Sequence, residues 1–157
     1  MKGHVVLAIG ALAVPVVAVL AANVAVAAPG LPGPLPLATR TVTEVTSFTS
    51  PSGNIGCYIE PGRARCDIRE RNWTPPPKAA SCPDFMGWGQ GLELSTGEPA
   101  GVVCAGDTAL TNGNPLAYGD TIVGGSIECT SLPSGMSCWD TQYGGEFTLS
   151  RQGYQLS

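Results

Sequence analysis

The chain has 157 residues, a formal net charge of −4 and a single histidine, and 43% of its residues are hydrophobic. This length allows one domain with a modest core. The histidine, His4, stands in the apolar N-terminal segment. A chain without that segment lacks the imidazole of a Ser-His-Asp triad or an imidazole-ligated zinc site. Net acidity also argues against nucleic-acid binding.

The N-terminal segment has the features of a secretory signal peptide. A short polar start precedes an apolar run over residues 5–22, and Ala25-Val26-Ala27 offers a small-residue cleavage site. A retained membrane anchor is the alternative, because the run approaches the roughly 20 residues that span a bilayer. Pro15 interrupts the run, so we predict a cleaved signal peptide over residues 1–27 and no stable membrane span afterwards.

A linker rich in proline and threonine is expected over residues 28–47, ahead of a domain over residues 48–157. Residues 28–38 contain four prolines and no charge, which favours a stiff, extended chain. Residues 39–49 are rich in threonine and valine and fit either a first strand or a solvated tether.

A Gly-x-Ile-x-Cys motif occurs twice, and each copy is followed by a second cysteine after eight further residues. The cysteine pairs are Cys57 with Cys66 and Cys129 with Cys138, and each pair has a Pro/Gly/Ser turn signal at its middle. Oppositely placed residues of a non-hydrogen-bonded antiparallel pair lie about 4.5 Å apart, which suits a disulfide. The motif therefore predicts two β-hairpins, each closed by its own bridge.

The third predicted bridge, Cys82–Cys104, follows by elimination. Six cysteines allow fifteen connectivities, and this pairing is one of them. In an exported chain these cysteines are expected to be bridged rather than metal-bound, which places the protein in an oxidising compartment outside the cell or in its envelope.

Strand-like segments recur at roughly ten-residue spacing, separated by Gly, Pro and Asn turns, without helical periodicity. Further strands are expected at residues 92–94, 101–104 and 146–151, with a glycine-rich loop at 87–91. The fold class is therefore predicted as all-β, a small disulfide-stapled sheet, sandwich or barrel built from short hairpins. The two motif copies are offset by 72 residues, and we interpret them as a shared hairpin role rather than a duplication.

Several segments together resemble an uncharacterised family of small secreted actinobacterial proteins with six cysteines. The resemblance begins at Phe48-x-Ser50-Pro51-Ser52-Gly53-Asn54-Ile55-x-Cys57. It continues through Arg65–Ile68, Pro75–Pro77, Cys82, Cys104–Thr108, Tyr118-Gly119 and Phe147-x-Leu149-Ser150-Arg151-x-x-Tyr154. It implies secretion and a disulfide frame, and it implies no activity.

Two groups of side chains are candidates for binding. The arginines could meet an acidic envelope polymer or protein, although basic residues also blunt exposed strand edges. The tryptophans could stack on sugars or form a protein interface, although such rings also cover disulfides. The candidates are Arg63, Arg65, Arg69, Arg71, Trp73, Trp88 and Trp139.

The expected function is non-catalytic binding by a secreted or envelope protein, with no cofactor and no metal. One alternative is a hydrolase of envelope polysaccharide that uses two carboxylates. The candidates for such a pair are Asp107, Asp120, Glu128 and Asp140. A structural envelope protein is a further alternative. Oxygen ligands for calcium are offered by Asp107, Asn112, Asn114 and Asp120, but we interpret the stretch as an ordinary Asn-Gly turn.

Overall fold

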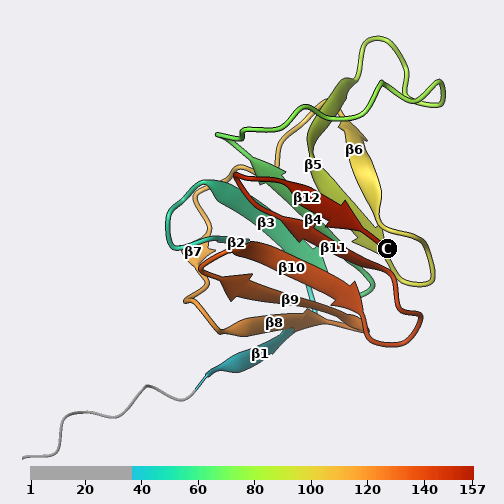
Figure 1. The fold of residues 1–157 in the computed structure, drawn as a ribbon. Coiled ribbons are helices and arrows are strands. Elements are labelled where there is room, and N and C mark those ends of the chain that lie inside the picture. The colour runs from blue at the N-terminus through green and yellow to red at the C-terminus, as the bar shows by residue number, and fades with distance from the viewer. Residues whose placement is uncertain (1–36) are drawn as a thin grey trace, which may run out of the picture. The chain divides into compact units, whose positions relative to one another are not determined.

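The computed structural model describes residues 37–157, which form β-strands and no helix (Figure 1). The signal peptide predicted over residues 1–27 lies outside the described residues. Within the described range, no helix is long and apolar enough to cross a membrane. The strands are β1 (Thr39–Val42), β2 (Thr46–Thr49), β3 (Ile55–Glu60), β4 (Arg63–Ile68), β5 (Gly87–Ser95), β6 (Gly101–Ala105), β7 (Asn114–Pro115), β8 (Thr121–Gly124), β9 (Ile127–Leu132), β10 (Gly135–Asp140), β11 (Glu146–Leu149) and β12 (Tyr154–Leu156).

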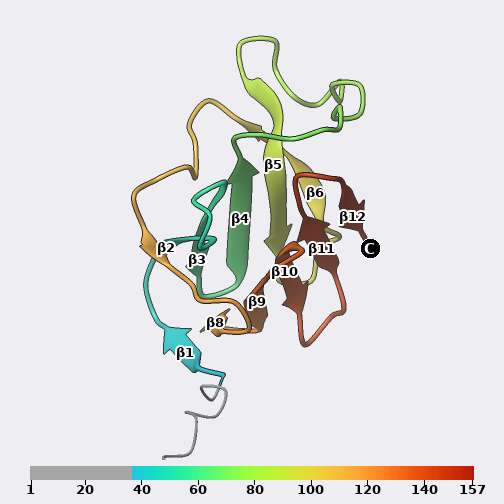
Figure 2. The same ribbon diagram turned by 60° about the vertical axis from the view of Figure 1, so that its left-hand side comes forward.

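The strands form two six-stranded mixed sheets in a sandwich-like arrangement. Sheet A has the order β1-β8-β9-β10-β11-β12, and sheet B has the order β6-β5-β4-β3-β2-β7. Figures 1 and 2 show β8 to β12 in one layer and β3 to β6 in the other. The all-β class predicted from the sequence is therefore confirmed, with a sandwich rather than a barrel.

The two sheets have the same connectivity. In each, five consecutive strands form an antiparallel meander, and a short sixth strand adds in parallel beside the first, as β7 does to β2 and β1 to β8. This sixth strand comes from the other half of the chain. Moving β3 and β4 forward by 72 residues gives the bounds of β9 and β10. The likeness in connectivity extends beyond the hairpins, whereas the 72-residue offset holds for the hairpins alone.

The three disulfides connect the cysteines that the sequence pattern paired. Cys57 faces Cys66 and Cys129 faces Cys138 in register, with Cα atoms 4.1 Å apart in both hairpins. Both bridges are fully buried within one apolar core between the sheets. Around them pack Phe48, Ile55, Ile59, Ala64, Ile68, Leu92, Leu94, Leu116, Ile122, Ile127, Met136, Phe147 and Leu149. Three disulfides indicate an oxidising, non-cytoplasmic location.

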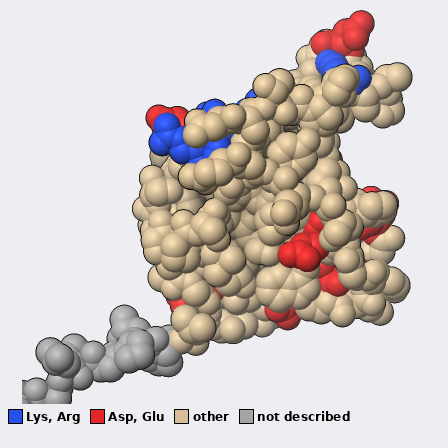
Figure 3. Space-filling view, viewed as in Figure 1, with Lys and Arg blue, Asp and Glu red and all other residues tan. Residues whose placement is uncertain are grey.

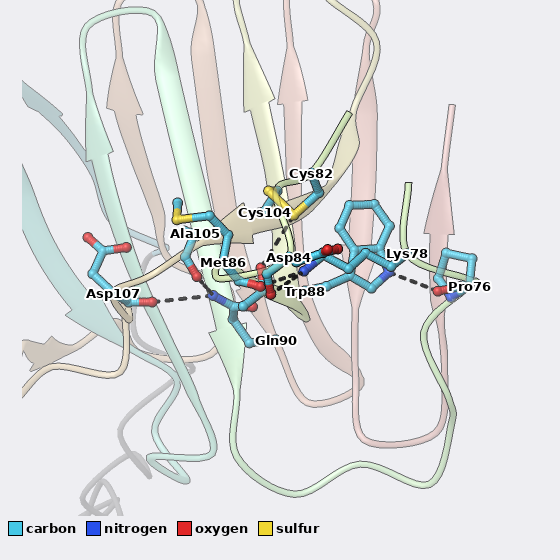
Figure 4. Close-up of a disulfide and its surroundings, with 11 residues drawn as sticks. Pro76, Lys78, Cys82, Asp84, Met86, Trp88, Gln90, Cys104, Ala105 and Asp107 are labelled. Atoms are coloured by element: carbon cyan, nitrogen blue, oxygen red, sulfur yellow. Dashed lines mark hydrogen bonds between the residues drawn. A yellow bond between two sulfur atoms is a disulfide. The ribbon is translucent and has the colours of Figure 1, made fainter. Parts of the chain in front are cut away.

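The third bridge, Cys82–Cys104, fastens the long connection between β4 and β5 to β6, with Cα atoms 5.8 Å apart. Figure 4 shows that Lys78 and Trp88 lie to one side of this bridge. The Lys78 ammonium donates to the carbonyl of Met86 (2.8 Å), and the Trp88 indole donates to the carbonyl of Pro76 (2.8 Å). Side chains thus hold a segment that has no strand of its own.

The structure differs from the sequence prediction at residues 87–91, which belong to β5 rather than to a loop. Glycines are required here for two reasons. Gly89 has a φ of 74°, beside a shift in register between β5 and β6. A Cβ at Gly91 would lie 2.0 Å from the carbonyl oxygen of Cys66 on β4. These glycines therefore permit a bent strand and a close approach of two backbones.

Part of the expected linker, residues 28–47, also lies in the described range. Thr39–Val42 forms β1 and pairs with β8, so the strand alternative holds there and the tether alternative does not. The short strands β8 and β12 had no clear sequence signal. They are positioned by pairing with β9 and β11.

Candidate functional site

The four candidate arginines do not form one cluster. Arg63 begins β4, whereas Arg69 and Arg71 follow the end of that strand. Six residues of extended chain separate Arg63 from Arg69 by roughly 20 Å. Arg63 forms an ion pair with Glu93 across the sheet (2.7 Å). A ligand that engages Arg69 therefore does not reach Arg63 unless it runs the length of the strand.

Arg65 is buried, with 2% of its surface exposed. Its guanidinium donates to both carboxylate oxygens of Asp67 (3.0 and 2.9 Å) and to the carboxylate of Asp107 (2.7 Å). Burial disfavours the charged form, but these hydrogen bonds outweigh it and raise the pKa of Arg65. Asp67 also accepts bonds from Thr108 and from the backbone N–H of Ala109. Arg65 thus fastens a loop over sheet B and is not free for a partner.

A groove of about 450 Å³ lies at one end of the sandwich, where segments of both sheets meet. Its lining comes from Ser50, residues 52–55 and residues 69–70 of the first half of the chain, and from Tyr118, residues 132–135 and residues 150–152 of the second half. Three of the segments that carry the family resemblance, at residues 50–55, 118 and 150–151, meet here. They contribute polar side chains to the groove rather than only to the core.

The groove has one arginine from each sheet. Arg69 follows β4 and is exposed, and its Nε donates to the carbonyl of Gly53 (3.3 Å). Arg151 follows β11 and lies 3.2 Å from the carboxylate of Glu70 in an exposed ion pair. Figure 3 shows Lys and Arg atoms gathered at the upper left end of this face, next to acidic atoms. The charged side chains in the lining of the groove are therefore these two arginines and Glu70.

Hydrogen bonds fix the shape of the groove wall at residues 50–55. The Asn54 amide bonds to both the N–H (2.9 Å) and the carbonyl (3.0 Å) of Glu70. The hydroxyl of Ser50 accepts a bond from the N–H of Ile55 (3.1 Å). Gly53 adopts a φ of 70°, which a residue with a side chain rarely adopts. The wall is therefore held in place before any ligand arrives.

Arg71 and Trp73 do not line the groove, but Trp73 bonds to Ser150, which does. The Arg71 guanidinium lies 4.5 Å from the centre of the Trp73 ring and donates to the carbonyl of Gly89. The Trp73 indole donates to the carbonyl of Ser150 (2.8 Å), and its ring packs on Tyr154 with centroids 4.7 Å apart. These two candidate binding residues thus connect the two sheets.

Trp88 and Trp139 lie elsewhere. Trp88 is half-buried beside the Cys82–Cys104 bridge, as Figure 4 shows, and Trp139 is half-buried on the outer face of sheet A. The three tryptophans therefore do not form one row of rings. Tyr118, an aromatic residue that the sequence also offered for a binding face, is 47% exposed at the groove. Sequence reasoning missed Arg151 as a binding residue, although it falls in a segment that carries the resemblance.

The four candidate carboxylates do not pair with one another. Asp107 pairs with Arg65, Asp120 accepts from the N–H of Ala38 (2.9 Å), and Glu128 is half-buried on sheet A. Hydrogen bonds from Arg65 lower the pKa of Asp107. At Asp140 burial opposes the charge, but the N–H groups of Gly97 and Gln142 outweigh it and lower the pKa.

A glycosidase of the carboxylate type needs one carboxyl group whose pKa is raised. The two shifts seen here are in the other direction, so they give the hydrolase alternative no support. Among residues 37–157, no group of three His, Cys, Asp or Glu side chains is placed to hold a metal ion.

Comparison with known proteins places the chain in a family. No curated protein and no solved structure matches it. The model of a family of unknown function, DUF6636, matches residues 33–156, which includes every described strand. The expectation of an uncharacterised family is thereby confirmed. The six cysteines of this chain form three disulfides. The chain belongs to the DUF6636 family of unknown function.

Proposed function

We propose that the protein is a secreted, non-catalytic binding protein that holds an acidic polysaccharide of the cell envelope in the groove at the end of the sandwich. The observation that carries this proposal is the convergence of Arg69 and Arg151, one from each sheet, on a preformed groove with an exposed Tyr118 ring. The signal peptide predicted at residues 1–27 and the three disulfides support an extracytoplasmic location.

The chemistry of the lining fits a sugar acid. Arginine binds carboxylate, sulfate or phosphate oxygens with two parallel N–H donors. The face of Tyr118 offers an apolar surface for a pyranose ring, and the hydroxyls of Ser52 and Ser134 stand in the same groove. An acidic ligand would compete with Glu70 for Arg151, whose ion pair is exposed and therefore weak.

The charge of the rest of the domain makes this groove distinctive. Residues 37–157 contain seven basic and twelve acidic side chains, a net charge of −5. One of the seven basic residues, Arg65, is buried against Asp67 and Asp107. The lining of the groove has two arginines and one glutamate, a net charge of +1 on an acidic domain, which favours an acidic polymer there.

The test uses a matched pair of polymers, polygalacturonate and its fully methyl-esterified form. We expect the domain to bind the acidic polymer and not the ester. Binding should weaken as salt rises from 0.1 to 1 M, because the Debye length shrinks from about 10 to 3 Å. The double variant Arg69→Gln/Arg151→Gln should bind at least tenfold more weakly in isothermal titration.

Arg40→Gln is the control that matches the charge removed by the single variant Arg151→Gln. Arg40 is exposed on β1 and does not line the groove. Its removal lowers the net charge by one unit at a distant place, so binding should stay within twofold of the wild type. Equal binding of the acid and the ester, or equal loss with Arg40→Gln and with Arg151→Gln, would overturn the proposal.

A further inference from the structure

The outer face of sheet A has a tryptophan between two carboxylates. Trp139 on β10 stands in register with Glu128 on β9 and with Glu146 on β11. Residues directly opposite one another in an antiparallel pair project to the same face and lie about 4.5–5.5 Å apart at Cβ. The ring is therefore flanked by an acidic side chain on both neighbouring strands.

A row of hydroxyl and amide side chains crosses the same face beside the tryptophan. It passes from Thr130 through Ser137 and Thr148 to Gln155, each in register with the next. Two shallow hollows of about 400 and 390 Å³ share Thr148 and Gln155, and the second includes Glu146. In Figure 1 no described segment crosses in front of β8, β9 and β10, so this face is open to a ligand.

Trp139 differs from the other two tryptophans in its hydrogen bonding. The indole N–H groups of Trp73 and Trp88 donate to the carbonyls of Ser150 and Pro76. The indole of Trp139 has no such partner among the described residues, and its ring is partly exposed. Trp139 therefore differs from a tryptophan that only covers a disulfide. It presents both an apolar ring face and an N–H donor to solvent.

We propose that Trp139, Glu128 and Glu146 form a second binding site, for a neutral polysaccharide. The C–H face of a pyranose stacks on an aromatic ring, and carboxylates accept hydrogen bonds from sugar hydroxyls. The same carboxylates repel an acidic polymer, so the ligand class differs from that of the arginine groove. The site is independent of the proposed function, because none of its three residues lines that groove.

The experiment is affinity gel electrophoresis of the full domain in gels that contain dextran, mannan or arabinogalactan. We expect at least one of these neutral polymers to retard the wild type. Trp139→Ala should weaken binding at least tenfold, and Glu128→Gln/Glu146→Gln should weaken it several-fold while keeping the fold. Phe85→Ala is the control, because Phe85 is an aromatic residue 87% exposed at another place and its loss should have no effect.

Three outcomes would overturn the proposal. One is the absence of retardation in all three gels, and another is retardation that Trp139→Ala leaves unchanged. The third is a dimer in sedimentation velocity that Trp139→Ala dissociates, since the face would then be an interface between two copies. Arg69→Gln/Arg151→Gln should retain neutral binding, so failure of one site is distinguishable from failure of the other.

Discussion

The two sheets have the same connectivity, but one row of in-register residues on the outer face differs between them. In sheet B the row is Gly56–Asp67–Gly91, and in sheet A it is Glu128–Trp139–Glu146. Gly56 and Asp67 stand 72 residues before Glu128 and Trp139. In sheet B, two glycines thus flank a carboxylate. In sheet A, two glutamates flank an aromatic ring.

The difference decides which face is covered. A Cβ at Gly56 would lie 2.6 Å from the carbonyl oxygen of Ala109, so glycine permits the loop to lie on sheet B. Asp67 then accepts bonds from Thr108 and Ala109 of that loop. No comparable covering is seen over sheet A among residues 37–157. One face therefore contributes stability, and the other is available for a ligand.

The largest effect on stability is expected from reducing the disulfides, including the buried hairpin bridge that each sheet has. In the chain-entropy model each ten-residue ring contributes about 2.7 kcal/mol and the ring of Cys82–Cys104 about 3.4 kcal/mol. The total of roughly 9 kcal/mol is comparable with a typical net stability of 5–15 kcal/mol. We expect full reduction to unfold the domain, as circular dichroism melting will show against the oxidised protein. A reduced protein that still melts cooperatively would show that the core suffices.

The next effect tests the covered face. Asp67→Ala leaves the buried guanidinium of Arg65 with Asp107 alone, so we expect a loss of about 3–5 kcal/mol in urea unfolding. A double variant, Arg65→Met/Asp67→Leu, removes both charges and should recover much of that loss. A loss below about 1 kcal/mol for Asp67→Ala would mean that the loop does not depend on this ion pair.

A smaller effect concerns the connection between the sheets. Asp140 of β10 accepts a bond from the N–H of Gly97 in the turn after β5. Its pKa is lowered, so its contribution is present above the unfolded value of about 3.9 and is lost as pH falls through the folded pKa. Wild type should therefore lose stability between pH 5 and 2 more steeply than Asp140→Asn. Parallel urea-unfolding curves for both proteins over this range would contradict that role.

The smallest effect is a gain in stability. Ser131 is fully buried, and its hydroxyl has no partner among the described residues, whereas the position 72 residues earlier is the apolar Ile59. Ser131→Ala removes an unpaired buried group and should raise the free energy of unfolding by about 1 kcal/mol. Ser137→Ala on the open face is the control and should change it by less than about 0.5 kcal/mol. Destabilisation by Ser131→Ala would indicate a hidden partner for the hydroxyl.

Local sequence signals predicted the local structure. Cys57 and Cys66 are equidistant from the Pro61-Gly62 turn, and the bridge forms because a hairpin places such residues opposite one another. Gly62 has a φ of 87°, as that turn requires. The same reasoning applied to the second hairpin, and the third bridge then followed by elimination.

Long-range arrangements could not be predicted in this way. Arg65 was a candidate for binding because no local pattern shows that residues 107–109 cross over it. The groove joins residues 50–55 to residues 150–152, about a hundred positions apart, and its meeting point depends on how the sheets pack. Trp139 was a candidate from the sequence. Its acidic neighbours could not be predicted, because the register of β9, β10 and β11 decides which residues lie beside it.

Acidic-sugar binding in the groove is tested most directly by nuclear magnetic resonance of the isotope-labelled domain during titration with trigalacturonic acid. We predict that amide shift changes gather at residues 52–54, Tyr118, Ser134 and Arg151, and that the amide of Asp67 in the covered row stays unchanged. Shift changes centred on β4 and β5, or no change at millimolar ligand, would contradict the assignment of acidic-sugar binding to the groove.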